Sequence, residues 1–204
     1  MPDDYANFQE LYQHHIENAE YRIHAHARPG PLIVLAIHAG GIELGTSELA
    51  RAIAGDEHSF YLFEGLTNDE NKKLHLTSTH FDEPQCLDLV QRHHSALSLH
   101  GFNGSPDDPQ IYMGGTDKKF IQLLLQTLKD NGYKVRINTQ KFAATDRSNI
   151  CNRTRSGQGV QIEIAHSLRR QFFQDFLTRH GREIITPQFT HFVQTIRSTL
   201  TIEK

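Results

Sequence analysis

The sequence is poor in cysteine and in long apolar runs, and both shortages exclude classes of protein. Its 204 residues include two cysteines, Cys86 and Cys151, too few for the disulfide framework of a small secreted domain. Neither lies in a Cys-x-x-Cys motif, so we expect two ordinary buried thiols and no thiolate metal site. No stretch approaches the roughly 18 apolar residues of a membrane helix, so we expect no membrane partner.

Several catalytic and nucleotide-binding motifs are also missing. The chain has no His-Glu-x-x-His, no Walker loop and no Gly-x-Ser-x-Gly motif. The stretch GQGVQI at 157–162 is not a dinucleotide fingerprint, because it lacks the last glycine and precedes an expected strand instead of a helix. The acidic, polar N-terminus MPDDYANFQELYQHH does not resemble a secretion signal.

Charge is nearly balanced overall but is uneven along the chain. The net charge is −3, from 21 basic and 24 acidic residues, which does not indicate a nucleic-acid partner. Residues 141–170 carry six basic and two acidic side chains, or +4, so the remainder carries −7. The basic side chains are Lys141, Arg147, Arg153, Arg155, Arg169 and Arg170. This segment indicates an anionic ligand; the alternative is a solvated loop and helix face.

Alternating strands and helices predict an α/β fold in one domain, 1–204, with a largely parallel sheet. The run LIVLAI at 32–37 is apolar throughout, as is typical of a strand buried on both faces. Further strands are expected at 59–65, 73–78, 95–101, 133–138 and 159–165. Helices are expected at 6–18, 46–54, 83–93, 116–130, 167–179 and 187–202.

Three polar residues lie at the ends of expected strands. His38 directly follows LIVLAI, His100 follows SALSL, and Glu163 lies near the end of GVQIEI. Ligands of open α/β sheets bind beyond the carboxyl ends of the strands, so we expect these side chains to form a site. The chain has 14 histidines, so their position relative to the strand ends decides which ones are candidates for the site. We treat most of the others, His75 included, as surface or packing residues.

The segment HAGGIELG at 38–45 adds Glu43 as a candidate ligand. Its three glycines allow the sharp turn that would bring Glu43 and His38 onto one ion. Two nearby ligands and a distant third, His100, are a common layout for catalytic zinc, in which two histidines and one carboxylate leave a position for water. A strand–helix turn that needs glycine only for its shape is the alternative.

Several motifs resemble those of phage and bacillar poly-γ-glutamate hydrolases, compact relatives of the zinc carboxypeptidases. The resemblance covers roughly residues 32–175. The motifs are HAGGIELGTSELA, LHLTSTHFDEP, SLHGF, the Gly114-Gly115 pair, and ATDRSNICNRTRSGQGVQIEI followed by Arg169-Arg170. It implies an open mixed sheet between helices, zinc ligands at His38, Glu43 and His100, and a general-base glutamate at Glu163. The wider carboxypeptidase pattern is His-x-x-Glu, whereas four residues separate His38 and Glu43 here.

The resemblance also implies the substrate, poly-γ-glutamate, in which every unit carries a free α-carboxylate. Arginine binds carboxylates bidentately, and two consecutive helix residues lie about 100° apart, so only one of a tandem pair faces a substrate. The candidate substrate-binding residues are Arg153, Arg155, Arg169, Arg170, Asn149 and His80. For His80, a loop-stabilising role is the alternative.

Two other functions compete with this one. The first is a zinc carboxypeptidase or amidase that acts on cell-wall γ-glutamyl peptides. The second is a non-catalytic polyanion-binding module, against which Glu163 argues, because a binder has no need of a carboxylate facing an anionic ligand. We expect a monomer without a nucleic-acid partner, either cytoplasmic or released by lysis to reach an extracellular polymer.

Overall fold

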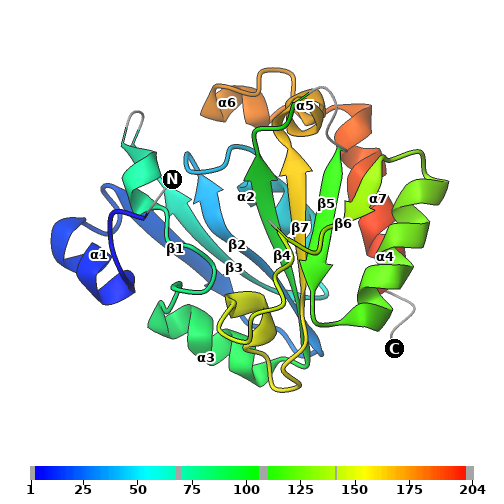
Figure 1. Ribbon diagram of the computed structural model, residues 1–204. Coiled ribbons are helices and arrows are strands. Elements are labelled where there is room, and N and C mark those ends of the chain that lie inside the picture. The colour runs from blue at the N-terminus through cyan, green and yellow to red at the C-terminus, as the bar shows by residue number, and fades with distance from the viewer. Residues whose placement is uncertain (1–2, 68–69, 106–109, 141, 201–204) are drawn as a thin grey trace.

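The computed structural model describes residues 3–67, 70–105, 110–140 and 142–200. Seven strands form one sheet in the order β1-β3-β2-β4-β7-β5-β6 (Figure 1). The strands are β1 (Tyr21–His26), β2 (Leu32–Gly40), β3 (Ser59–Gly65), β4 (Ser95–Phe102), β5 (Ile111–Gly115), β6 (Val135–Ile137) and β7 (Val160–Ala165). The central strands β3, β2, β4 and β7 run parallel, whereas β1 and β5 pair antiparallel with β3 and β7. The predicted open mixed, largely parallel sheet is confirmed.

Helices cover both faces of this sheet (Figure 1). The longer ones are α1 (Phe8–His14), α2 (Thr46–Ala54), α3 (Pro84–Arg92), α4 (Lys118–Asp130) and α7 (Pro187–Leu200). The short ones are α5 (His166–Arg169), α6 (Arg179–Arg182), η1 (Asn71–Leu74), η2 (Ile150–Asn152) and η3 (Arg170–Phe172). In the described ranges, no helix is long and apolar enough to cross a membrane.

The run LIVLAI divides the core, because alternate side chains of a strand point to opposite faces. Val34 and Ala36 belong to the cluster that includes residues of α2, α4 and α7. Ile33 and Ile37 belong to the cluster that includes residues of α1 and α3. All of these side chains are fully buried, which explains why the strand is apolar at every position. The histidine that follows therefore lies at the centre of the fold.

The strand predicted at 73–78 is wrong. Its first residues belong to η1, which ends at Leu74, and the rest form a loop. The carbonyl of Thr77 accepts from the backbone nitrogens of His80 and Phe81, at 2.7 and 3.0 Å, so this backbone closes a local turn instead of joining the sheet. The alternation of KLHLTS reflects instead a loop with buried Leu74 and Leu76.

The helix predicted at 167–179 is also wrong as one element. The chain leaves η3 at Phe173, which has extended backbone angles and bridges to Ile185. Phe172, Phe173 and Phe176 are all buried in the core that includes α7. The backbone bridge between Phe173 and Ile185 ends the helix there, while all three rings stay in one core.

Two strands have no counterpart in the sequence prediction. In β1, YRIHAH alternates in the manner of a half-buried edge strand. In β5, the last two residues are glycines, which weaken a strand signal. Gly114 has to be a glycine, because a Cβ at this position would lie 2.2 Å from the carbonyl oxygen of Phe142.

Candidate metal centre and substrate cleft

The carboxyl ends of β2, β4 and β7 lie side by side and carry three of the predicted site residues. In the parallel register of β4 and β7, His100 and Glu163 are direct partners. The register of β2 against β3 shifts between Ala36 and Ala39. Such irregularities re-aim side chains next to functional sites, and His38 lies within this one. The structure thus brings His38, His100 and Glu163 to one edge of the sheet.

The turn after β2 returns Glu43 to His38. Gly40 and Gly45 have φ values of 66° and 89°, in the left-handed region that side chains other than glycine rarely adopt. The backbone nitrogen of Glu43 donates to the carbonyl of His38 at 2.8 Å, which closes the turn. The glycines therefore do what the sequence predicted of them, since the turn they allow carries a carboxylate to the histidine.

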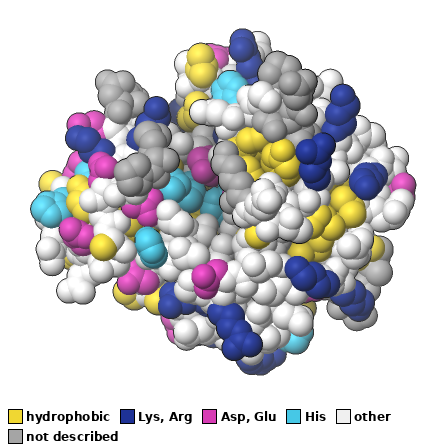
Figure 2. All heavy atoms as spheres, viewed as in Figure 1, with side chains coloured by type: hydrophobic (Ala, Val, Ile, Leu, Met, Phe, Trp, Pro, Cys, Tyr) yellow, Lys and Arg dark blue, Asp and Glu magenta, His cyan; other side chains and the backbone are white. Residues whose placement is uncertain are grey.

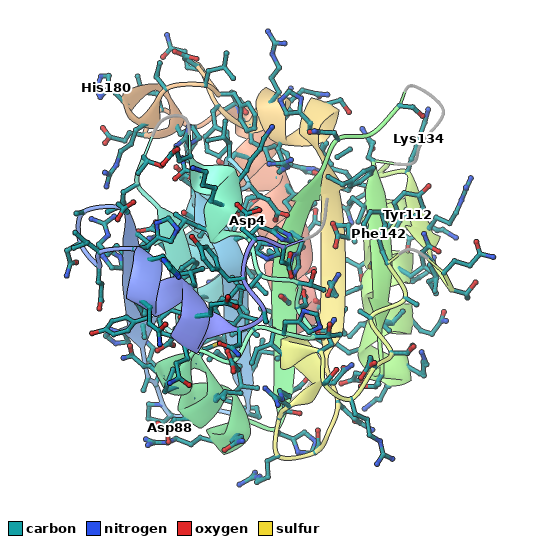
Figure 3. The ribbon with its side chains drawn as sticks, turned by 60° about the vertical axis from the view of Figure 1, so that its left-hand side comes forward. Asp4, Asp88, Tyr112, Lys134, Phe142 and His180 are labelled. Atoms are coloured by element: carbon teal, nitrogen blue, oxygen red, sulfur yellow. The ribbon has the colours of Figure 1, made fainter. Side chains whose placement is uncertain are left out.

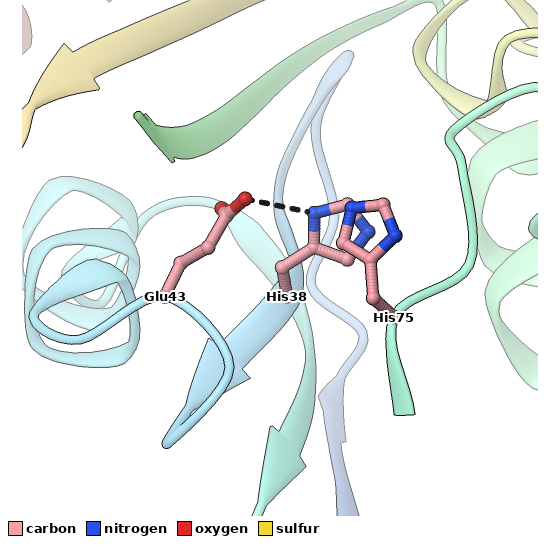
Figure 4. A group of neighbouring side chains, drawn as sticks. All are labelled: His38, Glu43 and His75. Atoms are coloured by element: carbon pink, nitrogen blue, oxygen red, sulfur yellow. Dashed lines mark hydrogen bonds and ion pairs between the residues drawn. The ribbon is translucent and has the colours of Figure 1, made fainter. Parts of the chain in front are cut away.

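Three candidate ligand atoms converge at this turn. Nδ1 of His38 lies 3.2 Å from Oε1 of Glu43 (Figure 4). Nδ1 of His100 lies 3.1 Å from Nδ1 of His38 and 3.8 Å from Oε2 of Glu43. All three side chains are wholly or largely buried. Two imidazoles and one carboxylate so close together match the donor set of an open zinc site.

Hydrogen bonds at the far side of each group fix its orientation. Nε2 of His38 donates to the carbonyl of Leu76 at 2.8 Å, and because a carbonyl only accepts, the neutral ring has a bare Nδ1. Nε2 of His100 lies 2.9 Å from the hydroxyl of Ser98, while the backbone nitrogen of Gly101 donates to Oε2 of Glu43 at 2.7 Å. Outer partners of this kind orient metal ligands, so the residues present fit a zinc ion.

Electrostatics favour the ligand forms of His100 and Glu43. For His38, burial lowers the pKa, but the charge and hydrogen bond of Glu43 prevail and raise it. Burial lowers the pKa of His100 to about 3, against the opposing charge of Glu43. Burial alone would raise the pKa of Glu43, but the charge and hydrogen bond of His38 prevail and lower it to about 2. A neutral imidazole and an ionised carboxylate are the states that bind a metal.

His75 is a neighbour that sequence reasoning missed. Its ring stacks on His38, with centroids 4.0 Å apart and an interplanar angle of 29°. Ligand atoms of His38, Glu43 and His75 also lie within 4.8 Å of one another (Figure 4). Stacked rings with nearly parallel planes do not direct their lone pairs at one ion, whereas His100 stands at 76° to His38. The geometry favours His100 as the third ligand, with His75 packed on the face of His38.

Glu163 is held next to this centre. Nε2 of Gln161 donates to Oε1 of Glu163 at 2.7 Å, and Oε1 of Gln161 accepts from Asn149 at 2.9 Å. Burial, with the negative charge of Glu43, raises the pKa of Glu163 to about 8. Asn149, predicted to bind substrate, thus lines the cleft but also orients the amide that holds Glu163.

Two adjoining pockets, which we call the two lobes of the cleft, share Glu43, His75 and Gly101 in their linings. The first lobe has a volume of about 500 Å³ and includes Glu163 and Phe142 in its lining. The Phe142 ring packs at a tilt against Phe102 and Tyr112, with centroids 5.6 Å away in both cases. Tyr112 and Phe142 lie side by side in Figure 3. The second lobe, of about 600 Å³, includes Lys72, Lys73, His166 and Arg169. Histidine side chains gather on this face of the molecule (Figure 2).

The structure separates the predicted arginines. Arg169 is buried, 3% exposed, and donates from Nε to the carbonyl of Ile164 at 3.0 Å and from a terminal nitrogen to that of Leu44. It fits there because Gly101 has no side chain, since a Cβ would lie 2.3 Å from its Cζ. Arg170 is exposed, as expected when one residue of the tandem faces inward.

The other candidates lie outside the cleft lining. The backbone nitrogen of Arg155 donates to the carbonyl of His93, just before β4, and is therefore at the amino end of the strand that carries His100. Arg153, two residues earlier, ends η2. His80 is exposed, with Nδ1 3.6 Å from Asp3. Among the described residues, the cleft lining includes Arg169 and Asn149 but not Arg153, Arg155, Arg170 or His80.

Comparisons with known proteins agree with this fold. A family model described as poly-γ-glutamate hydrolase matches residues 5–195. The Bacillus subtilis (strain 168) protein YndL is 38% identical over 194 residues, which cover 94% of this chain and 75% of YndL. A bacteriophage poly-γ-glutamate hydrolase structure aligns with a TM-score of 0.94 and 34% identity, over 99% of this chain and 98% of that one. A zinc-free YndL structure aligns with a TM-score of 0.93 and 35% identity, over 99% of both chains.

Proposed function

Because this chain belongs to the poly-γ-glutamate hydrolase family, we propose that it hydrolyses the γ-glutamyl amide bonds of that polymer with one zinc ion. The ion would be held by Nδ1 of His38, Nδ1 of His100 and the carboxylate of Glu43. One observation carries the proposal: these atoms lie within 3.8 Å of one another while hydrogen bonds occupy the opposite side of each group. The same donor set would have little purpose in a non-catalytic binding module.

When bound, zinc supplies Lewis acidity, which polarises an amide carbonyl and makes water a stronger acid. The protein supplies the proton transfers. Glu163 takes a proton from the attacking water and delivers it to the amide nitrogen as the C–N bond breaks. Gln161 keeps the carboxylate of Glu163 in place for both transfers through its 2.7 Å hydrogen bond.

The charge balance around Glu163 supports this role. Burial is the first cause of its raised pKa and the charge of Glu43 is the second. A cation bound by the three ligands would offset the charge of Glu43 and so lower the pKa of Glu163. A general base works best when its pKa is near the operating pH, and a buried carboxylate beside a cation meets this condition.

The second lobe supplies positive charge for the α-carboxylates of the substrate. Arg169, Lys72 and Lys73 all line it, and the fixed guanidinium of Arg169 offers a planar fork that suits a carboxylate. Because the two lobes meet at Glu43 and His75, a polymer can pass from one lobe to the other across the centre. We therefore propose cleavage within the chain, which a carboxypeptidase acting on chain ends would not perform.

The test is to follow the size distribution of poly-γ-glutamate during incubation with the purified protein. We expect the average mass to fall early, before free glutamate accumulates. Activity should disappear with a chelator and return with zinc. The His38→Ala variant is the control for a contaminating hydrolase. Release of single glutamate units from the start would support the carboxypeptidase alternative, and an unchanged polymer would refute the proposed substrate.

A further inference from the structure

Asp3 contacts the two residues that flank Leu76. Its Oδ1 accepts from Nδ1 of His75 at 2.8 Å, and its Oδ2 accepts from the backbone nitrogen of Thr77 at 2.7 Å. The side chain is buried, 7% exposed. Both carboxylate oxygens are therefore used on one short segment, 75–77, which lies 72 or more positions away along the chain.

The same segment makes two contacts with His38. The carbonyl of Leu76 accepts from Nε2 of His38 at 2.8 Å, and the ring of His75 stacks on the His38 ring at 4.0 Å. Asp3 thus holds the atoms on both sides of the carbonyl that orients His38, and also the ring that covers one face. None of these contacts comes from the sheet, because 75–77 follows η1 as a loop.

We propose that Asp3 is a positioning residue that fixes the ring orientation and tautomer of His38 through segment 75–77. The inference rests on the proposed function, in which Nδ1 of His38 is a zinc ligand. The tautomer matters because a metal binds the bare nitrogen of a neutral imidazole, and the hydrogen bond of the other nitrogen decides which one is bare. A loop carbonyl performs this role only if the loop is itself held in place.

Asp3→Asn is the discriminating variant. Asparagine keeps the size of the side chain, but only one of its two terminal atoms accepts hydrogen bonds. Both contacts can persist only if Nδ1 of His75 becomes an acceptor, so either a contact or the tautomer of His75 must change. Asp82→Asn is a matched control, since Oδ1 of Asp82 accepts from the backbone nitrogen of Phe8 at 2.7 Å and so anchors the same N-terminal segment at another point.

The first measurement is zinc affinity, by competition with a chromogenic chelator. We expect Asp3→Asn to bind zinc about tenfold more weakly than the unmodified protein, at the lower end of the effect of outer partners of metal ligands. We expect Asp82→Asn to bind as the unmodified protein does. Equal affinity in all three proteins, or equal losses in both variants, would overturn the assignment of Asp3. Failure of the unmodified protein to bind zinc would instead refute the proposed function.

The second measurement needs no metal and separates positioning from folding. Nitrogen-15 NMR of the imidazoles in the metal-free protein reports which nitrogen of His38 carries the proton. We expect the proton on Nε2 in the unmodified protein and in Asp82→Asn, and a mixture of tautomers in Asp3→Asn with an intact backbone spectrum. A folded Asp3→Asn protein in which His38 keeps one Nε2–H tautomer would refute the proposal.

Discussion

Replacing Glu163 by glutamine should greatly reduce activity and yet stabilise the metal-free protein at alkaline pH. Glutamine keeps the shape of the side chain and an oxygen that accepts from Nε2 of Gln161, but it takes no proton from water. We expect kcat to fall by roughly 10²- to 10⁴-fold, the usual contribution of a positioned acid–base group. Zinc affinity should remain, because the proposed ligand atoms belong to other residues.

The stability gain follows from the raised pKa of Glu163. In the folded, metal-free protein burial and the charge of Glu43 raise this pKa from 4.5 to about 8. Since the folded protein then binds the proton more tightly than the unfolded chain, stability is full below pH 4.5 and declines as pH rises to about 8. At about 1.4 kcal/mol per pH unit, the loss reaches roughly 5 kcal/mol above that pH.

Glutamine carries no charge at any pH, so the variant should not show this decline. The assay is urea denaturation of both metal-free proteins at pH 5 and pH 9, compared through the change in unfolding free energy between the two. We expect the larger decrease in the unmodified protein. An equal decrease in both proteins would mean that Glu163 is not a buried carboxylate beside Glu43, and near-normal activity of the variant would refute its role as the base.

Two other predictions test the metal centre and the cleft. His38→Ala and His100→Ala should each abolish stoichiometric zinc binding in elemental analysis, because either change leaves two protein ligands. The His75→Ala variant should keep its zinc. Zinc retained in all three variants would refute the ligand set. Arg169→Lys keeps the charge but loses the fork, so kcat/KM on poly-γ-glutamate should fall about 10- to 100-fold, the value of a charge-assisted hydrogen bond. Arg170→Lys, at an exposed position, should change kcat/KM little, and an equal loss in both would contradict the inward assignment of Arg169.

The sequence alone identified the residues whose positions depend on local structure. An apolar run such as LIVLAI forms a strand buried on both faces, and a histidine directly after it must lie at the carboxyl end of that strand. The same reasoning applies to His100 and Glu163, which adjacent parallel strands place in direct register. The glycine turn that returns Glu43 to His38 is also a local property, readable from the spacing of its glycines.

Only the tertiary structure decided which distant residues surround these groups. Asp3 and His75 meet His38 through a loop whose sequence alternates as a strand does, so no periodicity identifies them. The positive charge of 141–170 was apparent from the sequence, but a count of charges does not show where each side chain lies in the fold. Arg155 lies at the amino end of β4, whereas Arg169 is buried beside Gly101 at the other end. The periodicity of the sequence determines the strands and where they end. The packing of the chain around those ends determines which arginine side chains reach the site.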